Sequence, residues 1–128
     1  MGKEPIIVVG GEPNSIFLEI FFKSLKTNVF KSPLIIIVSK KLLQEQMKKL
    51  NFNFKINDID KELKDFSKLN NDKINLINVD YDFKKCFGKI TDKSNKYINE
   101  AFKTGLNIIM QNNFSKFING PVSKKSFL

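Results

Sequence analysis

Two stretches of this sequence place polar side chains directly after short apolar runs, where a strand would turn into a helix. The first, GGEPNS at residues 10–15, follows the run IIVV at residues 6–9. The second, NGPVSKK at residues 119–125, follows Phe117 and Ile118. In open α/β sheets, ligands bind at the carboxyl ends of strands, beside helix N-termini. The chemistry expected at both junctions is therefore ligand binding.

The first junction offers one carboxylate and two side chains that can cap a helix. Glu12, at a strand end, could bind a substrate hydroxyl or a metal-bound water; the alternative is a solvated turn carboxylate. Asn14 or Ser15 can accept hydrogen bonds from the first turn of the helix that follows. The stretch contains neither G-x-G-x-x-G nor G-x-x-x-x-G-K-[ST], so it does not predict a Rossmann or P-loop nucleotide site.

The second junction combines a forced turn with positive charge. Gly120 and Pro121 end the preceding strand. Ser123 and the backbone amides after it could hold an anion, with Lys124 adding charge. The alternative is a helix cap followed by two surface lysines.

The residue types that are missing narrow the chemistry further. The chain has no His and a single Cys, Cys86, so it cannot form an internal disulfide or build a typical zinc or iron site from its own residues. It also lacks the commonest general base. Cys86 follows Lys84 and Lys85 but has no His to act as its base, which favours an incidental role. We therefore assign no catalytic, cofactor-binding or metal-binding residue to this chain.

The net charge of +9 comes from 22 basic and 13 acidic residues, and every basic residue is Lys. Arg is the residue that reads guanine and phosphate in a bidentate manner. Its absence argues against sequence-specific binding of nucleic acid. Weak, Lys-driven association remains an alternative, and it should fall steeply as salt rises.

The elements that position these junctions follow from hydrophobic patterning. Continuous apolar runs at Ile6–Val9 and Leu34–Val38 predict strands buried on both faces. A nearly all-apolar helix follows the first, through Leu25. Ser39 is expected to cap a second helix over Lys40–Leu50. This alternation predicts parallel pairing with right-handed crossovers.

The middle of the chain has weaker signals. A short strand is expected near Phe54, a helix over Asp60–Leu69, a turn at residues 70–72, an alternating strand nearer a sheet edge over Ile74–Val79, and a loop over residues 80–88.

The strongest helical pattern in the chain begins at Thr91 or Asp92 and runs to about Gln111, and Gly105 within it suggests close packing. Asn112 and Asn113 should end it, before a short buried strand at residues 117–118. Residues 123–128 read as the first turn of another helix.

Length and hydropathy predict one α/β domain over residues 1–128 with a three-layer, doubly wound, mostly parallel sheet. No apolar run approaches the roughly 20 residues of a membrane span. The chain enters its first strand without a signal peptide, so a cytoplasmic location is expected.

Three segments, in order, resemble the 4-hydroxythreonine-4-phosphate dehydrogenase family. Residues 11–20 resemble its G-[DE]-P-[AS]-G-I-G-P-E-[IV] segment, with Ser15 and Phe17 in place of two glycines and Leu18 in place of the proline. Residues 88–95 resemble G-K-x-[ST]-x-x-S-G, with Asn95 replacing the last glycine. Residues 119–124 resemble T-[AG]-P-[IV]-x-K, with Asn119 replacing the threonine and Lys124 matching the lysine.

The resemblance implies the N-terminal portion of a longer enzyme of pyridoxal phosphate (pyridoxine) biosynthesis, with a fold like that of isocitrate and isopropylmalate dehydrogenases. Such an oxidoreductase is a homodimer that uses NAD and a divalent metal (Zn, Mg or Co) to oxidise a small phosphorylated hydroxy amino acid, which then loses carbon dioxide. The family's metal ligands and most of its NAD pocket lie beyond this stretch. Glu12, Asn14 and Lys124 are then the expected substrate-binding residues, and this truncated chain is expected to be inactive alone.

An alternative from another class is a stand-alone α/β module that binds a small molecule or anion without catalysis. Such a module would have to be stable and monomeric by itself, which distinguishes it from one part of a dehydrogenase.

Overall fold

The computed structural model describes residues 4–11, 13, 16–27, 30–62, 66, 69–81 and 92–120, with the backbone alone for residues 92–95. Within these residues the helices and strands are, in chain order, β1 (Ile6–Val9), α1 (Phe17–Thr27), β2 (Leu34–Val38), α2 (Lys40–Leu50), β3 (Ile56–Asp58), β4 (Ile74–Asn78), α4 (Asp92–Asn112) and β5 (Phe117–Asn119).

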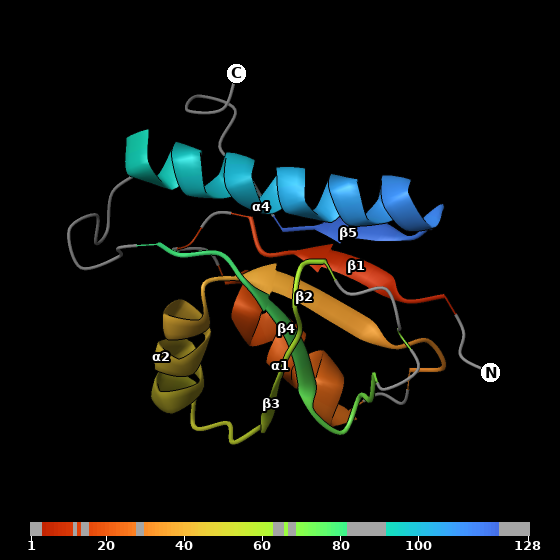
Figure 1. The fold of residues 1–128 in the computed structure, drawn as a ribbon. Coiled ribbons are helices and arrows are strands. Elements are labelled where there is room, and N and C mark those ends of the chain that lie inside the picture. The colour runs from red at the N-terminus through yellow and green to blue at the C-terminus, as the bar shows by residue number, and fades with distance from the viewer. Residues whose placement is uncertain are drawn as a thin grey trace.

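The strands form a single parallel sheet in the order β3-β4-β2-β1-β5 (Figure 1). Helices α1 and α2 pack on one face of this sheet, and α4 crosses the other face over β1 and β2. The three-layer, doubly wound α/β architecture predicted from the alternation of strands and helices is therefore confirmed. None of the described helices combines the length and the apolar character needed to cross a membrane.

The unbroken apolar runs of β1 and β2 are explained by burial on both faces. Successive side chains of a strand point to opposite sides of the sheet. Ile7 and Val9 accordingly join the core beneath α4, while Val8 joins the core beneath α1 and α2. All five residues of β2 are buried, because this strand lies at the centre of the sheet.

Helix α2 has the boundaries predicted from local signals. The Ser39 hydroxyl accepts a hydrogen bond from the Leu42 N–H at 3.2 Å, as an N-cap does. The helix ends at Leu50, and the left-handed φ of 63° at its C-cap, Asn51, lets the Asn51 N–H reach the Lys48 carbonyl. Its buried residues are Leu42, Leu43 and Met47.

The close packing expected around Gly105 is also present. A Cβ atom on Gly105 would lie 3.0 Å from Val9 Cγ2, 3.2 Å from Phe117 Cε2 and 3.3 Å from Ile37 Cδ1. The missing side chain therefore lets α4 sit close to β1, β2 and β5.

Two predictions in the middle of the chain need correction. The third strand is not centred near Phe54 but begins at Ile56, because register with Ile74 of β4 selects the pairing residues. Of the helix expected over residues 60–69, the structure describes residues 60–62, 66 and 69, and none of these is helical. Phe66 and Leu69 instead pack onto the core on the α4 face.

The exposure of two strands follows from their order in the sheet. As the alternating pattern of residues 74–79 predicts, β4 lies nearer an edge than the central β2, but it is paired on both sides, and Asn75 within it is buried. Its amide is satisfied there: it donates to the Leu34 carbonyl at 2.9 Å and accepts from Asn57 at 3.0 Å. Conversely, Ile118 was expected in a buried strand, but β5 is the outermost described strand on its side, and Ile118 is 50% exposed.

Candidate functional site

The two polar junctions singled out in the sequence begin at neighbouring strands. β1 and β5 pair in parallel, so their carboxyl ends meet at one edge of the sheet. The Gly120 N–H donates to the Val9 carbonyl at 2.7 Å, closing the ladder at the point where both strands end. The fold thus brings together the start of two segments that lie more than a hundred residues apart in the sequence.

Glycine allows the backbones at this edge to approach closely. A Cβ atom on Gly120 would lie 2.2 Å from the Gly10 carbonyl oxygen and 2.9 Å from the Phe17 ring. No side chain fits such a space without moving the backbone. Gly11, the next residue of the first junction, has a positive φ of 73°, which is the turn that a glycine adopts without strain.

The three predicted site residues, Glu12, Asn14 and Lys124, lie outside the described residues, as do Cys86 and the segment 88–91. The structure therefore describes the residues that lead into both junctions: Gly10, Gly11 and buried Pro13 in the first, and Asn119 and Gly120 in the second. It brings the two junctions together at their strand ends, and the roles of the three side chains stay predictions.

The carboxyl ends of β2 and β4 form the adjoining part of the same edge. The Ser39 N–H donates to the Tyr97 hydroxyl at 3.0 Å, and the Lys40 N–H donates to Asn78 Oδ1 at 2.8 Å. With the Ser39 hydroxyl bonded to the Leu42 N–H, three amides at the start of α2 have partners within the protein. These three N–H groups are therefore already hydrogen-bonded within the protein and are not available to bind an anion.

Tyr97 connects α4 to this edge and was not predicted from the sequence. Its ring contacts Tyr81, with the ring centroids 4.9 Å apart, and its hydroxyl reaches across to the β2–α2 turn. Burial raises the pKa of Tyr97 well above the ordinary tyrosine value, so it stays a neutral phenol. No local sequence signal marks a hydrogen bond between residues 58 positions apart.

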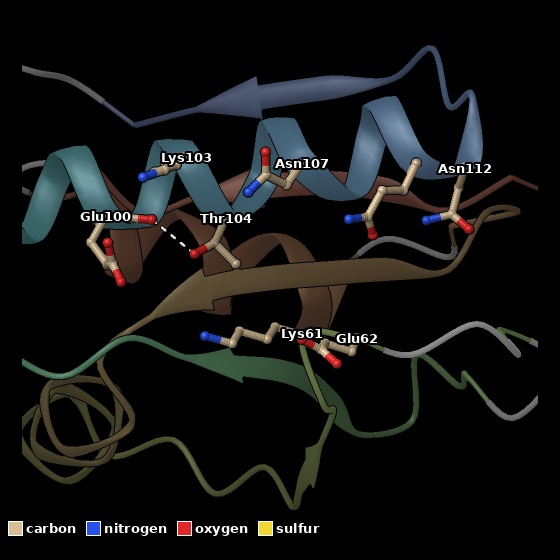
Figure 2. A pocket seen from close by; sticks show the side chains of 8 residues that line it. Lys61, Glu62, Glu100, Lys103, Thr104, Asn107 and Asn112 are labelled. Carbon is tan, nitrogen blue, oxygen red and sulfur yellow. Dashed lines mark hydrogen bonds between the residues drawn. The ribbon is translucent and has the colours of Figure 1, made fainter.

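Two polar cavities flank α4 on the side away from β5. One, of about 600 Å³, opens beside the carboxyl end of β4, and the other, of about 840 Å³, continues along the helix (Figure 2). They share the residues Lys61, Glu100 and Thr104. Figure 2 shows Glu100, Thr104 and Asn107 along α4 with Lys61 and Glu62 opposite them. Charges of both signs line this surface, which gives it no preference for an anion or a cation.

The described residues do not form a metal site. Nowhere among them do three His, Cys, Asp or Glu side chains come together in a way that could hold a metal ion. Among these residues, the ion pairs Lys23–Glu19 at 2.9 Å and Lys40–Asp58 at 2.8 Å join single charges on exposed surfaces. The divalent metal implied by the sequence resemblance therefore has no set of ligands among the residues that the structure describes.

A family model described as pyridoxal phosphate biosynthetic protein PdxA matches residues 30–128. The chain belongs to this family. The match includes the second junction and the approach to α4, while the first junction lies before it. No curated protein matches this sequence closely enough to count as a relative.

Solved structures share the fold of nearly the whole chain. A 4-hydroxythreonine-4-phosphate dehydrogenase from Burkholderia phymatum has a TM-score of 0.78 at 16% identity, over 98% of this chain and 38% of that one. The enzyme of the same name from Klebsiella pneumoniae has a TM-score of 0.77 at 16% identity, over 97% of this chain and 39% of that one. This PdxA-family chain therefore spans about two fifths of the length of those dehydrogenases and shares the fold of that part.

Proposed function

We propose that this chain is the N-terminal part of a 4-hydroxythreonine-4-phosphate dehydrogenase, and that it supplies one wall of the substrate cleft. Membership of the PdxA family and a fold like that of two such dehydrogenases support the proposal. The observation that carries it is the junction of β1 and β5, where Gly120 lies against Gly10. A ligand at that edge can contact both polar segments at once.

The residues proposed to bind the substrate are those of the two junctions. The Glu12 carboxylate would accept a hydrogen bond from a substrate hydroxyl, and Asn14 would orient the same end of the molecule. Lys124, with the amides after Ser123, would hold the phosphate as a point charge beside a helix start. The reaction proposed for the whole protein is oxidation of the hydroxyl with NAD, followed by loss of carbon dioxide.

The remaining machinery would come from residues outside this stretch. The chain has no His, and its described residues hold no metal cluster. We therefore propose that the metal ligands and the NAD pocket belong to the rest of a full-length, homodimeric, cytoplasmic enzyme. The purified 128-residue chain should then show no turnover with substrate, NAD and a divalent metal. Measurable NADH formation would refute the proposal that the metal ligands and the NAD pocket lie outside this chain.

The test of the cleft wall is a binding titration of the chain with 4-hydroxythreonine-4-phosphate, followed by the backbone amide NMR signals of Gly10, Gly11 and Gly120. Binding at the paired junctions should shift all three signals. Lys124→Ala should weaken binding by about tenfold, as expected when one charged hydrogen bond is lost. Lys125→Ala removes the same charge one residue away and is the matched control. Equal effects of the two substitutions would show that only net charge matters.

A second function, binding without catalysis, is favoured by one feature of the structure. Both strand ends that lead into the junctions are already paired within these 128 residues, so no further segment is needed to bring them together. A stand-alone module would bind the phosphorylated compound as tightly by itself as within a longer protein. The same titration, done on the 128-residue chain and on the longer protein, separates the two functions.

A further inference from the structure

The end of β5 carries a dipeptide with a chemistry of its own. Asn119 and Gly120 form the single Asn-Gly pair in the sequence. In such a pair the backbone nitrogen of the glycine can attack the side-chain amide carbon of the asparagine, because glycine has no Cβ to hinder the approach. Asparagine is counted among the thermolabile residues of proteins. This pair is therefore a candidate site of spontaneous deamidation.

The reaction consumes one water molecule and releases one ammonia. The Gly120 nitrogen gives its proton to a solvent base and bonds to Cγ of Asn119. The Cγ–Nδ2 bond breaks, and the amide nitrogen takes a proton from solvent and leaves as ammonia. Water then opens the resulting succinimide ring at either of its two carbonyls. One opening leaves Asp, and the other leaves isoaspartate, whose backbone runs through the former side chain and is one methylene longer. Nothing is oxidised or reduced.

The folded chain engages the nitrogen that would attack. The Gly120 N–H donates to the Val9 carbonyl of β1 at 2.7 Å. Gly120 is itself buried, with the backbone of Gly10 directly against it. A solvent base therefore does not reach this N–H while β5 is paired with β1, and the hydrogen bond must break before the nitrogen can react.

The strand conformation also opposes closure of the ring. Asn119 lies in β5 and pairs in register with Val9. In the succinimide, Cβ of Asn119 and the Gly120 nitrogen lie on the same side of the Cα–C bond, whereas a ψ of about +115° in a parallel strand turns them apart. The Asn119 amide donates to the Gly120 carbonyl oxygen at 2.9 Å, which holds the side chain toward that oxygen. Ring closure needs a rotation that takes Gly120 away from Val9.

We propose that Asn119–Gly120 is a site of spontaneous deamidation, and that the pairing of β5 with β1 protects it. Each opening of that pairing frees the Gly120 nitrogen and lets the Asn119 backbone rotate, so modified chains accumulate with the time spent open. Threonine, which the family motif has at this position, carries no side-chain amide and cannot react in this way. The protecting contacts all lie within the described residues, so the protection does not depend on the function proposed for the junction.

The modification would in turn oppose the pairing. Isoaspartate lengthens the backbone between Asn119 and Gly120, so the Gly120 N–H no longer meets the Val9 carbonyl while the rest of β5 keeps its register. The site has no space for the added methylene, because Gly10 and Phe17 already leave no room for a Cβ on Gly120. The isoaspartate chain should therefore unfold at a lower urea concentration than the unmodified chain.

The test compares the purified chain with a synthetic peptide of residues 114–124, which is too short to form the sheet. Peptide mass spectrometry follows the replacement of the side-chain NH₂ by OH, and circular dichroism confirms that the chain is folded. Deamidation should be at least about tenfold slower in the folded chain than in the peptide, which corresponds to a protection of about 1.4 kcal/mol. In urea the rate in the chain should rise with the population of opened chains and reach that of the peptide.

Two outcomes of this comparison are decisive. Equal rates in the peptide and in the folded chain would overturn the proposal, because the pairing would then give no protection. Asn119→Gln should abolish the modification in the peptide and in urea, since its amide would have to close a larger ring. Modification that persists at the same rate in Asn119→Gln would place the reaction at another residue and would also overturn the proposal.

Two variants separate the β1–β5 pairing from the stability of the whole chain. Phe117 lies in β5, and its ring contacts Phe102 with the centroids 6.0 Å apart. Phe54 lies at the opposite end of the sheet, before β3, where its ring contacts Phe22 and Phe52. Phe117→Ala and Phe54→Ala each remove a partly buried ring, but only the first loosens β5 directly.

Deamidation in urea-free buffer should be faster in Phe117→Ala than in Phe54→Ala when circular dichroism shows both variants to be folded. Equal acceleration in the two variants would overturn the proposal, because protection would then come from the fold as a whole. If Phe117→Ala does not fold, the comparison of the unchanged chain with the peptide decides, since it requires no variant.

Discussion

Replacing Gly105 with Ala sets helix propensity against packing. In an exposed helix, Ala is favoured over Gly by about 1 kcal/mol. At Gly105 the new Cβ would lie 3.0–3.3 Å from Val9, Ile37 and Phe117, closer than the 3.5–4.0 Å optimum for carbon atoms. Val9 and Ile37 have no exposed surface and so little room to move. Overpacking of this kind costs about 1–3 kcal/mol. We therefore expect a net loss of about 1 kcal/mol in the free energy of unfolding.

The propensity term can be measured in the same helix. Asn99 is exposed on α4, so the difference between Asn99→Ala and Asn99→Gly isolates the gain from Ala over Gly. Urea denaturation of the four chains gives both differences. The sign at Gly105 should be opposite to the sign at Asn99. If Gly105→Ala stabilises the chain by as much as Ala gains over Gly at Asn99, α4 is not packed as described.

A double substitution identifies the contact responsible. Val9→Ala removes the Cγ2 atom that lies nearest to the new methyl group. In that background Gly105→Ala should lose at least half of its cost, because contacting residues couple in a double-mutant cycle. Unchanged cost in the Val9→Ala background would exclude this steric explanation.

Four further substitutions test other contacts of the fold. Gly120→Ala should destabilise the chain more than Gly105→Ala in urea denaturation, and it should broaden the NMR signals of β5. Gly10→Ala should destabilise the chain less than Gly105→Ala in the same titration, because its Cβ would lie 3.3 Å from Val38. Tyr97→Phe leaves a buried Ser39 N–H without its acceptor and should cost about 1–3 kcal/mol by urea denaturation. Hydrogen bonds from Ser115 to the Glu4 carboxylate hold the pKa of that group below its usual value of 4.5. The ionised Glu4 carboxylate therefore stabilises the folded chain above pH 4.5, and this stabilisation is lost as the pH falls through the lowered pKa. The difference in melting temperature between the unchanged chain and Glu4→Gln should accordingly vanish in acid.

Local sequence signals were sufficient for the parts of the fold that depend on neighbouring residues. Ser39 caps its helix through a bond to a residue three positions on, and the run of β2 already indicates burial on both faces. The spacing of α4 and the glycine within it likewise predicted a helix packed closely on the sheet. Each of these predictions rests on residues that are close together in the sequence.

Features that depend on strand order could not be read from local patterns. Ile118 is exposed because its strand is outermost, and Asn75 is buried because its strand lies between two others. The hydroxyl of Tyr97 finds its partner across the sheet edge. The candidate site shares this limit: the sequence indicated both junctions, but only the fold brings Gly10 against Gly120.

The pairing of β1 with β5 has a consequence for the order in which the chain folds. It joins residues more than a hundred positions apart, the longest separation of any strand pair that the structure describes. Non-local pairing of this kind carries a large entropy cost and slows folding. During synthesis the first junction acquires this neighbour only after the segment up to β5 has been made. A ligand that spans both junctions would bind only the state in which β1 and β5 are paired, and it would shift the folding equilibrium toward that state.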